Sequence, residues 1–290
     1  ENSVDLKEFG GATVYSISCN GYYFGNDVNS LNIDSEFRAN PLIHGSNTLT
    51  VLIGKDNKFY TLQIPVAVIT EEIGDVVRFN ELMKSDSAEY AIYGYYKLTA
   101  DIGKPETAFN NGNDTNWQNV DGLYGFRGTL DGAGHSITGT VFSRGLFGLV
   151  GKGAVIKNIT FNMNQYNAGK VLFGYSMIGA TIDNVKVNVT KQTNDGITEI
   201  SPNTLSGLLT CVFSYGNTFN QLVVDAQKTD VDTLFGSCAY YGYPAGYEEN
   251  KFTSCTVKAK SLVGLACTNN ANKVVTPYEN VSGLTVTLGA

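Results

Sequence analysis

The sequence predicts an all-β protein: a right-handed parallel β-helix with an N-terminal capping helix, preceded by a small N-terminal β-sandwich. Three observations predict this fold. Short apolar units recur between residues 145 and 266, a strand-like alternating segment follows each unit, and residues 1–70 show no such repeat. We therefore expect the sandwich at residues 1–70 and the β-helix at residues 71–290, with the capping helix within residues 71–90.

The first 70 residues are typical of short alternating strands, with turns at residues 20–21 and 55–58. A hairpin is predicted for TLTVLIGKDNKFYTLQIPVAVI, in which apolar residues of the outgoing strand face those of the returning one: Leu49, Val51, Ile53, Tyr60, Leu62 and Ile64. A domain of this size buries only a small core, so we expect it to be stabilised by packing against the larger domain.

The stretch that joins the two parts contains the best helix candidate, in DVVRFNELMKSDSAEY. Asp75 is a candidate N-cap residue, and the residues after it place apolar groups near helical spacing: Val76, Val77, Phe79, Leu82 and Met83. The first coil of a β-helix would otherwise expose an unpaired strand edge. We therefore expect this helix to cover that edge.

Five short apolar units carry the repeat, and their sequences are GLFGLV, VLFGYS, GLLTCV, TLFGSC and SLVGLA. The steps between their leading leucines are 26, 36, 26 and 28 residues, from the positions Leu146, Leu172, Leu208, Leu234 and Leu262. Each unit is too short to bury an apolar face alone, but stacked units can bury one together. Successive coils would then pair in parallel, and parallel crossovers are overwhelmingly right-handed.

One polar position precedes the alternating strand of each unit and is occupied by Asn158, Asn184, Gln221, Ser254 and Asn280. Stacked amide side chains can hydrogen-bond along such a column, and Asn tolerates the left-handed backbone of a bend. We expect a structural role for this column, in the turns of the coil.

The stretch GFRGTLDGAGHSITG, residues 125–139, places Asp131 and one of the two histidines, His135, among five glycines. Followed by GLFGLVGKGAVIKNITF, it resembles the opening of the pectin-lyase-like β-helix modules of bacterial cell-surface proteins, of the GLUG-repeat and IgA-peptidase-like type. The resemblance runs from Ile73 to the C-terminus. It implies that Asp131 bonds the amides of a corner and that His135 flanks the coil end, so neither is expected to be catalytic.

Residues 1–70 resemble, by pattern, the small Ig-like modules that precede β-helices in Gram-positive gut surface proteins. The chain opens with ENSVDLKEFG, without Met, a basic start or an apolar signal core. We therefore expect a secreted or cell-surface protein whose signal peptide and anchor lie outside this segment.

Composition excludes some partners and offers no sign of a cofactor. The formal net charge is -7, which argues against nucleic acid and against an anionic membrane surface, and no apolar run approaches the length of a membrane span. The five cysteines contain no CxxC pair, so the spacing of a zinc site is absent. We expect no metal and no cofactor, and we expect the cysteines to act as small buried apolar residues.

The resemblance also leaves an enzyme open, because pectin-lyase-like folds include polysaccharide lyases and glycoside hydrolases. Hydrolysis needs two carboxylates about 5–10 Å apart, and lyases use a base and commonly a Ca²⁺ held by carboxylates. Here acids are sparse: we expect Asp183 to be the only acid of its column, and Asp230 and Asp232 to lie at a solvated turn. We assign no catalytic residue.

Aromatic residues offer the other kind of site. The insert CAYYGYPAGYEENKF concentrates four tyrosines that could stack on sugars or on a protein partner: Tyr240, Tyr241, Tyr243 and Tyr247. The alternative is that these rings pack against the side of the β-helix. We expect a non-catalytic extracellular module, an adhesin that binds a glycan or a surface protein; the alternative is a carbohydrate-active enzyme.

Overall fold

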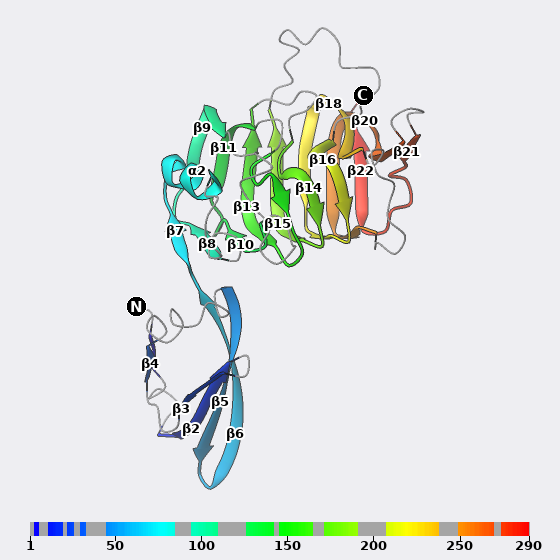
Figure 1. Cartoon of the computed structure of the whole chain (residues 1–290). Coiled ribbons are helices and arrows are strands. Elements are labelled where there is room, and N and C mark those ends of the chain that lie inside the picture. Colours follow the sequence, from blue (N-terminus) through cyan, green and yellow to red (C-terminus); the bar gives the residue numbers. More distant parts are fainter. Residues whose placement is uncertain are drawn as a thin grey trace. The chain divides into compact units, whose positions relative to one another are not determined.

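The computed structural model describes residues 3–5, 11–19, 22–25, 30–32, 45–84, 94–109, 126–141, 145–164, 171–190, 207–237, 249–269 and 274–289. The chain divides into two compact units, Glu1–Glu71 and Glu72–Ala290 (Figure 1). Strands dominate both units, and α2 (Val76–Lys84) is the helix of the described residues. The predicted all-β class is confirmed.

The first unit contains a four-stranded antiparallel sheet, with the strand order β3 (Tyr22–Gly25), β2 (Thr13–Cys19), β5 (Gly45–Lys55) and β6 (Lys58–Val68). A separate antiparallel pair is formed by β1 (Ser3–Asp5) and β4 (Ser30–Asn32). The predicted hairpin is present in the expected register, with these pairs opposite each other: Leu49 and Ile64, Val51 and Leu62, Ile53 and Tyr60. Asp56 and Asn57 both have positive φ, 51° and 60°, as a two-residue hairpin turn requires.

One face of this sheet is apolar and buried. Its fully buried side chains are Val14, Ile17, Cys19, Leu49, Val51 and Ile53, and Leu62, Ile64 and Val66 of β6 pack against them. The alternation of the strands puts the intervening residues on the other face. Much of residues 1–44 lies outside the described residues, so the second layer of an Ig-like sandwich stays a prediction.

The second unit is built from three ladders of parallel strands. The first ladder contains β8 (Tyr95–Leu98), β10 (Thr129–Asp131), β13 (Val155–Met163), β15 (Thr181–Val189), β17 (Thr218–Asn220) and β19 (Lys251–Thr253). The second contains β9 (Ile102–Phe109), β11 (Ser136–Val141), the later halves of β13 and β15, the first halves of β18 (Val223–Ser237) and β20 (Cys255–Asn269), and β22 (Leu284–Leu288). The third contains β12 (Leu149–Val150), β14 (Gly174–Ile178), β16 (Gly207–Tyr215) and the later halves of β18 and β20.

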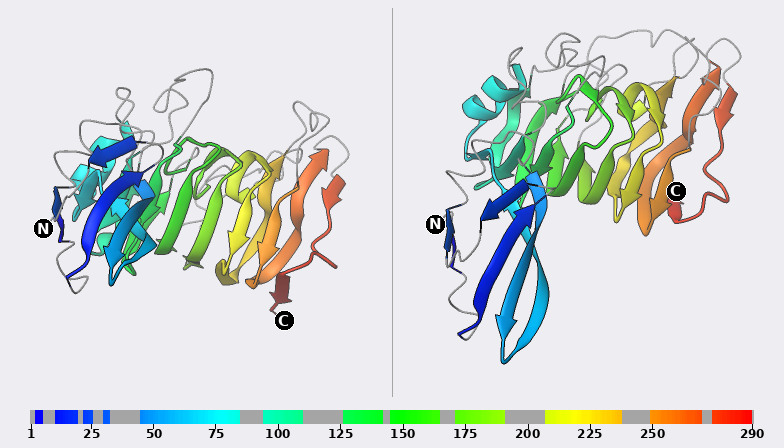
Figure 2. Two further views of the ribbon diagram at one scale, coloured as in Figure 1. Left: turned by 90° about the horizontal axis from the view of Figure 1, so that it is seen from below. Right: turned by 60° about the horizontal axis from the view of Figure 1, so that its bottom comes forward.

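Two further strands lie beside these ladders. β7 (Glu71–Ile73) pairs with β8, and β21 (Val274–Thr276) pairs antiparallel with the end of β20. Figure 2 shows the strands of this unit following one another in chain order along a single direction. Parallel pairing between strands so far apart in sequence requires a crossover at each step, as the repeat predicts.

Residues of all three ladders meet in one buried core. Phe161 of the second ladder contacts Phe173, directly before β14, with ring centroids 5.7 Å apart, and Phe219 of the first ladder lies 5.5 Å from Phe235 of the third. Four leading leucines of the repeat are fully buried in this core: Leu146, Leu172, Leu208 and Leu234. The apolar rows therefore face a shared interior.

The register corrects the fifth unit of the repeat. Thr233 pairs with Gly264 and Phe235 with Ala266, so the residue opposite Leu234 is Leu265 and not the expected Leu262, which pairs with Val231. The sequence SLVGLA contains two leucines that are both buried, at 6% exposure each, so the sequence pattern alone fits either frame.

All five residues expected in the polar column have positive φ: Asn158 52°, Asn184 51°, Gln221 52°, Ser254 54° and Asn280 68°. The first four share one column, as predicted. Asn280 does not, because Cys255 pairs with Leu284, which places Gly283 (φ 78°) beside Ser254. A Cβ on Gly283 would lie 2.0 Å from the Phe252 carbonyl oxygen, so only glycine fits this place.

Helix α2 begins as predicted. Asp75 Oδ1 accepts a hydrogen bond from the Arg78 amide at 2.9 Å, the geometry of an N-cap. Phe79 is fully buried and its ring lies 5.8 Å from that of Phe109 in β9, whereas Val77, expected among the apolar residues, is 68% exposed. Figure 1 shows α2 beside β9, at the end of the stack where the ladders begin.

Candidate functional site

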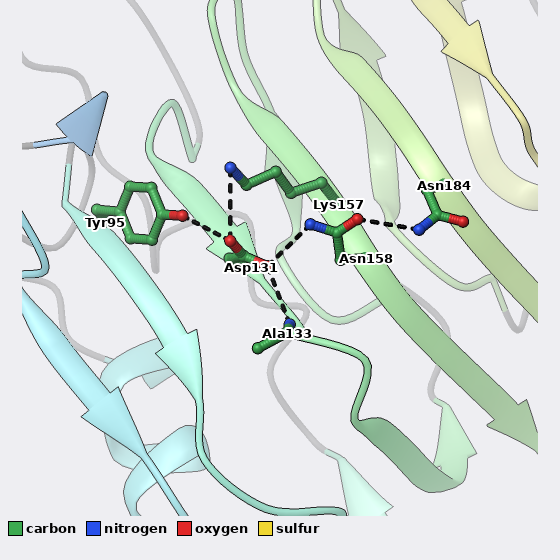
Figure 3. A network of polar contacts seen from close by, with 6 residues as sticks. All are labelled: Tyr95, Asp131, Ala133, Lys157, Asn158 and Asn184. Carbon is green, nitrogen blue, oxygen red and sulfur yellow. Dashed lines mark hydrogen bonds and ion pairs between the residues drawn. The ribbon is translucent and has the colours of Figure 1, made fainter. Parts of the chain in front are cut away.

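A compact polar cluster lies where the first ladder begins, on β8, β10 and β13 (Figure 3). Parallel register places Lys97, Asp131, Lys157 and Asp183 in one column, so that opposite charges alternate from strand to strand. We expected Asp183 to be the only acid of this column. That expectation is wrong, because Asp131 of the preceding GTLDG stretch pairs with Lys157 and joins the same column.

Asp131 is the centre of the cluster and accepts from four donors. The Tyr95 hydroxyl donates to Oδ2 at 2.6 Å, and Lys157 Nζ lies 3.4 Å from the same oxygen. Oδ1 accepts from the Ala133 amide at 2.9 Å and from Asn158 Nδ2 at 3.3 Å. Asp131 thus bonds a turn amide, as the resemblance implied, and also joins β8, β10 and β13.

The contacts within the cluster favour an ionised Asp131, a neutral Tyr95 and a charged Lys157. Burial favours the neutral form of Asp131, but the hydrogen bonds from Tyr95, Ala133 and Asn158 and the charge of Lys157 outweigh it and lower the pKa of this carboxyl. Burial and the bond to Asp131 raise the pKa of Tyr95. Burial opposes the charge of Lys157, yet Tyr95 and Asp131 raise its pKa. At neutral pH the three groups are therefore a carboxylate, a phenol and an ammonium.

One amide–amide hydrogen bond extends this cluster to the next strand, β15. Asn184 Nδ2 donates to Asn158 Oδ1 at 3.0 Å, which links the strand after β13 to Asp131. A second run lies on the second ladder, where Asn188 donates to Asn162 at 2.8 Å and Asn162 donates to Thr138 at 3.0 Å. The expected bonding of stacked amides is thus present between Asn158 and Asn184, and the run on the second ladder was not predicted.

These groups are poorly suited to acid–base chemistry. A catalytic acid needs a raised carboxyl pKa and a catalytic lysine a lowered pKa, and both shifts here have the opposite sign. Asp131 and Asp183 lie two strand spacings apart, about 10 Å between their Cα atoms, with Lys157 between them. The two acids are therefore spaced like a carboxylate pair, but Asp131 already accepts from four donors.

Two further acids, Asp101 and Asp230, bond groups on neighbouring strands. Asp101 Oδ1 accepts from the Ser136 amide at 2.7 Å and lies 3.6 Å from His135 Nδ1, and these contacts lower the pKa of Asp101. His135 therefore flanks the start of β11. Asp230 lies within β18 rather than at the expected turn, and it bonds Lys260 Nζ at 2.8 Å and Ser261 Oγ at 2.7 Å.

The predicted binding tyrosines Tyr240, Tyr241, Tyr243 and Tyr247 lie outside the described residues. Cys19 and Cys255 are buried and form no disulfide, and burial raises the pKa of the Cys19 thiol. Within the described ranges no three His, Cys, Asp or Glu side chains gather closely enough to hold a metal ion. In the same part of the chain, no helix has the length and apolar character needed to cross a membrane.

Two members of the cluster, Tyr95 and Lys157, were not predicted as site residues. The signal that could have found them is the likeness of YYKL, TLDG, VIKN and TIDN, which the register superimposes in the first ladder. No family model, no curated protein and no solved structure matches this chain.

Proposed function

We propose that residues 72–290 wind as a right-handed parallel β-helix, and that the chain is a non-catalytic, extracellular cell-surface module that presents this rod and binds a glycan or a surface protein. The handedness is supported by general topology. Each strand pairs in parallel with its counterpart in the next repeat, and parallel crossovers are right-handed in almost all cases.

The observation that carries the non-catalytic proposal is the commitment of the Asp131 cluster to neighbouring strands. Both oxygens of Asp131 are occupied by donors from β8, from its own turn and from β13. The pKa shifts hold the cluster in the charge state that maximises these bonds. Such a cluster stiffens the first coils, and its own carboxylate and ammonium are engaged with each other and with neighbouring strands.

A carbohydrate-active enzyme is the second candidate, supported by the placement of Asp131 and Asp183 in one column. Their Cα atoms lie about 10 Å apart, a separation that can bring the two carboxyl groups to the roughly 6.5–9.5 Å found in inverting glycosidases. In that case Asp183, which is only partly buried, would face the substrate.

One sample tests both candidates. The 290-residue chain is screened on a glycan array and, in parallel, incubated with neutral and acidic polysaccharides while new reducing ends and unsaturated products are measured. We expect specific binding without chain cleavage. Cleavage that is lost in Asp183→Asn would overturn the non-catalytic proposal and establish the enzyme.

A replacement of all four insert tyrosines by alanine locates the binding site. Loss of array binding in this variant would assign the ligand to the insert at residues 238–252. Absence of any glycan binding leaves the protein-partner form of the proposal, which is then tested by cross-linking on intact bacterial and host cells; absence of cross-linked partners there would reject binding altogether.

A further inference from the structure

The outward face of the sheet in the first unit carries an exposed aromatic strip. Tyr15 is 44% exposed, Phe59 68% and Tyr23 53%, although large apolar rings are usually covered. Register places Phe59 opposite Gly54 and Tyr23 opposite Ser18, on the face away from the buried core. The strip therefore belongs to one surface of β2, β3, β5 and β6.

Tyr15 and Phe59 form a fixed pair at one end of this face. Their ring centroids are 5.2 Å apart at 66°, an edge-to-face contact. The Tyr15 ring lies directly over Gly54, where a Cβ would come within 2.5 Å of its Cε2 atom. An aromatic ring that covers a strand glycine stabilises the sheet, so the position of Tyr15 needs no binding function to explain it. It does not explain Phe59, whose ring is the most exposed and covers no core.

The surface between the two aromatic ends is uncharged and combines hydroxyl and amide groups with the apolar side chain of Leu52. Tyr23 lies level with Thr50, four residues along β5 from Gly54, which separates the two ends by about 13 Å. Between them the Thr50 hydroxyl donates a hydrogen bond to Gln63 Oε1 at 3.2 Å. This bond is exposed, so the other hydrogen-bonding groups of both side chains face solvent. The residues of this face whose side chains the structure describes are all uncharged: Thr13, Tyr15, Ser16, Ser18, Tyr23, Thr48, Thr50, Leu52, Gly54, Phe59, Thr61, Gln63 and Pro65.

We propose that this face binds a neutral oligosaccharide, with Phe59 and Tyr15 stacking on the C–H face of one sugar and Tyr23 on another. A sugar ring is apolar on its faces and polar at its edge, which matches aromatic rings flanking hydroxyl and amide groups. The described side chains of this face carry no charge, which favours a neutral glycan over an acidic one. The proposal deepens the binding function proposed above and rests on it, but places the contact in the first unit.

The test is native gel electrophoresis in gels that contain hydroxyethylcellulose, xyloglucan, arabinoxylan, galactomannan, pullulan or dextran. The chain carries a formal charge of -7 and migrates on its own, so retardation reports binding. We expect at least one neutral polysaccharide to retard the wild type, and Phe59→Ala to weaken that binding about tenfold, with Phe59→Trp retaining it. Tyr60→Ala is the matched control, because Tyr60 is 46% exposed in the same strand but on the opposite face.

Several results overturn the proposal. It fails if no neutral polysaccharide retards the wild type, or if Phe59→Ala and Tyr23→Ala bind as the wild type does. It also fails if binding survives Phe59→Ala but disappears when the four insert tyrosines are replaced, a result that leaves the proposed function intact. A different result would reject only the proposed function. If the chain cleaves a polysaccharide and Phe59→Ala still weakens its binding, the non-catalytic function is rejected and this binding face is retained.

Discussion

Replacing Asp131 by asparagine should destabilise the second unit although the two side chains are nearly the same size. The carboxylate accepts at both oxygens, from Tyr95 and Lys157 at one and from Ala133 and Asn158 at the other. An asparagine must turn its NH₂ group toward one of these donor pairs. Loss of the charge-assisted bond from Tyr95, together with the loss of the partly buried ion pair, is expected to cost about 2–4 kcal/mol.

The measurements are urea unfolding and thermal unfolding, both followed by circular dichroism, with pulsed hydrogen exchange and mass spectrometry to assign the transition to residues 72–290. For a unit of this size a loss of 2–4 kcal/mol lowers Tm by roughly 4–16 °C. Asp183 lies in the same column but lacks the four donors that surround Asp131. Asp183→Asn should therefore change the free energy of unfolding by less than about 0.5 kcal/mol. Equal effects of the two substitutions would refute the reasoning.

A double-mutant cycle isolates the central bond. Tyr95→Phe removes the hydroxyl that donates at 2.6 Å, so Asp131→Asn should cost less in that background, with a coupling of about 1–2 kcal/mol. Additive effects would show that the bond contributes no stability of its own.

The same carboxyl gives a pH dependence of known sign. Its pKa is lowered on folding from the ordinary value of 3.8, so its contribution is complete above that value and disappears as the pH falls through the lower folded value. The stability difference between the wild type and Asp131→Asn should therefore be constant near neutral pH and narrow below pH 3.8. A difference that widens on acidification would contradict this assignment.

Three further pairs of substitutions test the fold by the same unfolding measurement. Asn158→Gly keeps the positive φ but loses two side-chain bonds, so it should cost about 1 kcal/mol, and Asn158→Ala about 1 kcal/mol more; equal costs would argue against backbone strain. Phe79→Ala should cost about 3–5 kcal/mol by opening a cavity beneath α2, whereas Val77→Ala, on the exposed face, should be nearly neutral. Gly145→Ala places a Cβ 2.4 Å from the Gly174 nitrogen and should be far more harmful than Gly153→Ala, which shares its positive φ but meets open space.

Local patterns in the sequence were sufficient for much of the fold. The hairpin of β5 and β6, the N-cap at Asp75 and the left-handed residues Asn158 and Asn184 follow from short-range chemistry, because turn type, capping and φ preferences act within a few residues. Frame errors arose where the local pattern was ambiguous, at the two leucines of SLVGLA and at the loop before Gly283.

The polar cluster could not be predicted in the same way. Tyr95 and Asp131 are 36 residues apart in the sequence, and their contact depends on a register that no single strand specifies. The burial that raises the pKa of Tyr95, and the contacts with Tyr95 and Asp131 that raise the pKa of Lys157 against its burial, likewise come from neighbouring strands. Lys157 therefore looked like an ordinary surface lysine of an alternating strand.

The sequence by itself determined the class of fold, the repeat and the conformation of its corners, because periodic apolar residues and residues tolerant of positive φ act locally. Only the tertiary structure decided which residues share a column: that Asp131 lies between two lysines, that Leu265 follows Leu234, and that Tyr15 covers Gly54 beside Phe59. The physical reason is that strand register is fixed by packing of whole strands against one another, and a shift that hardly changes local propensity changes every lateral contact.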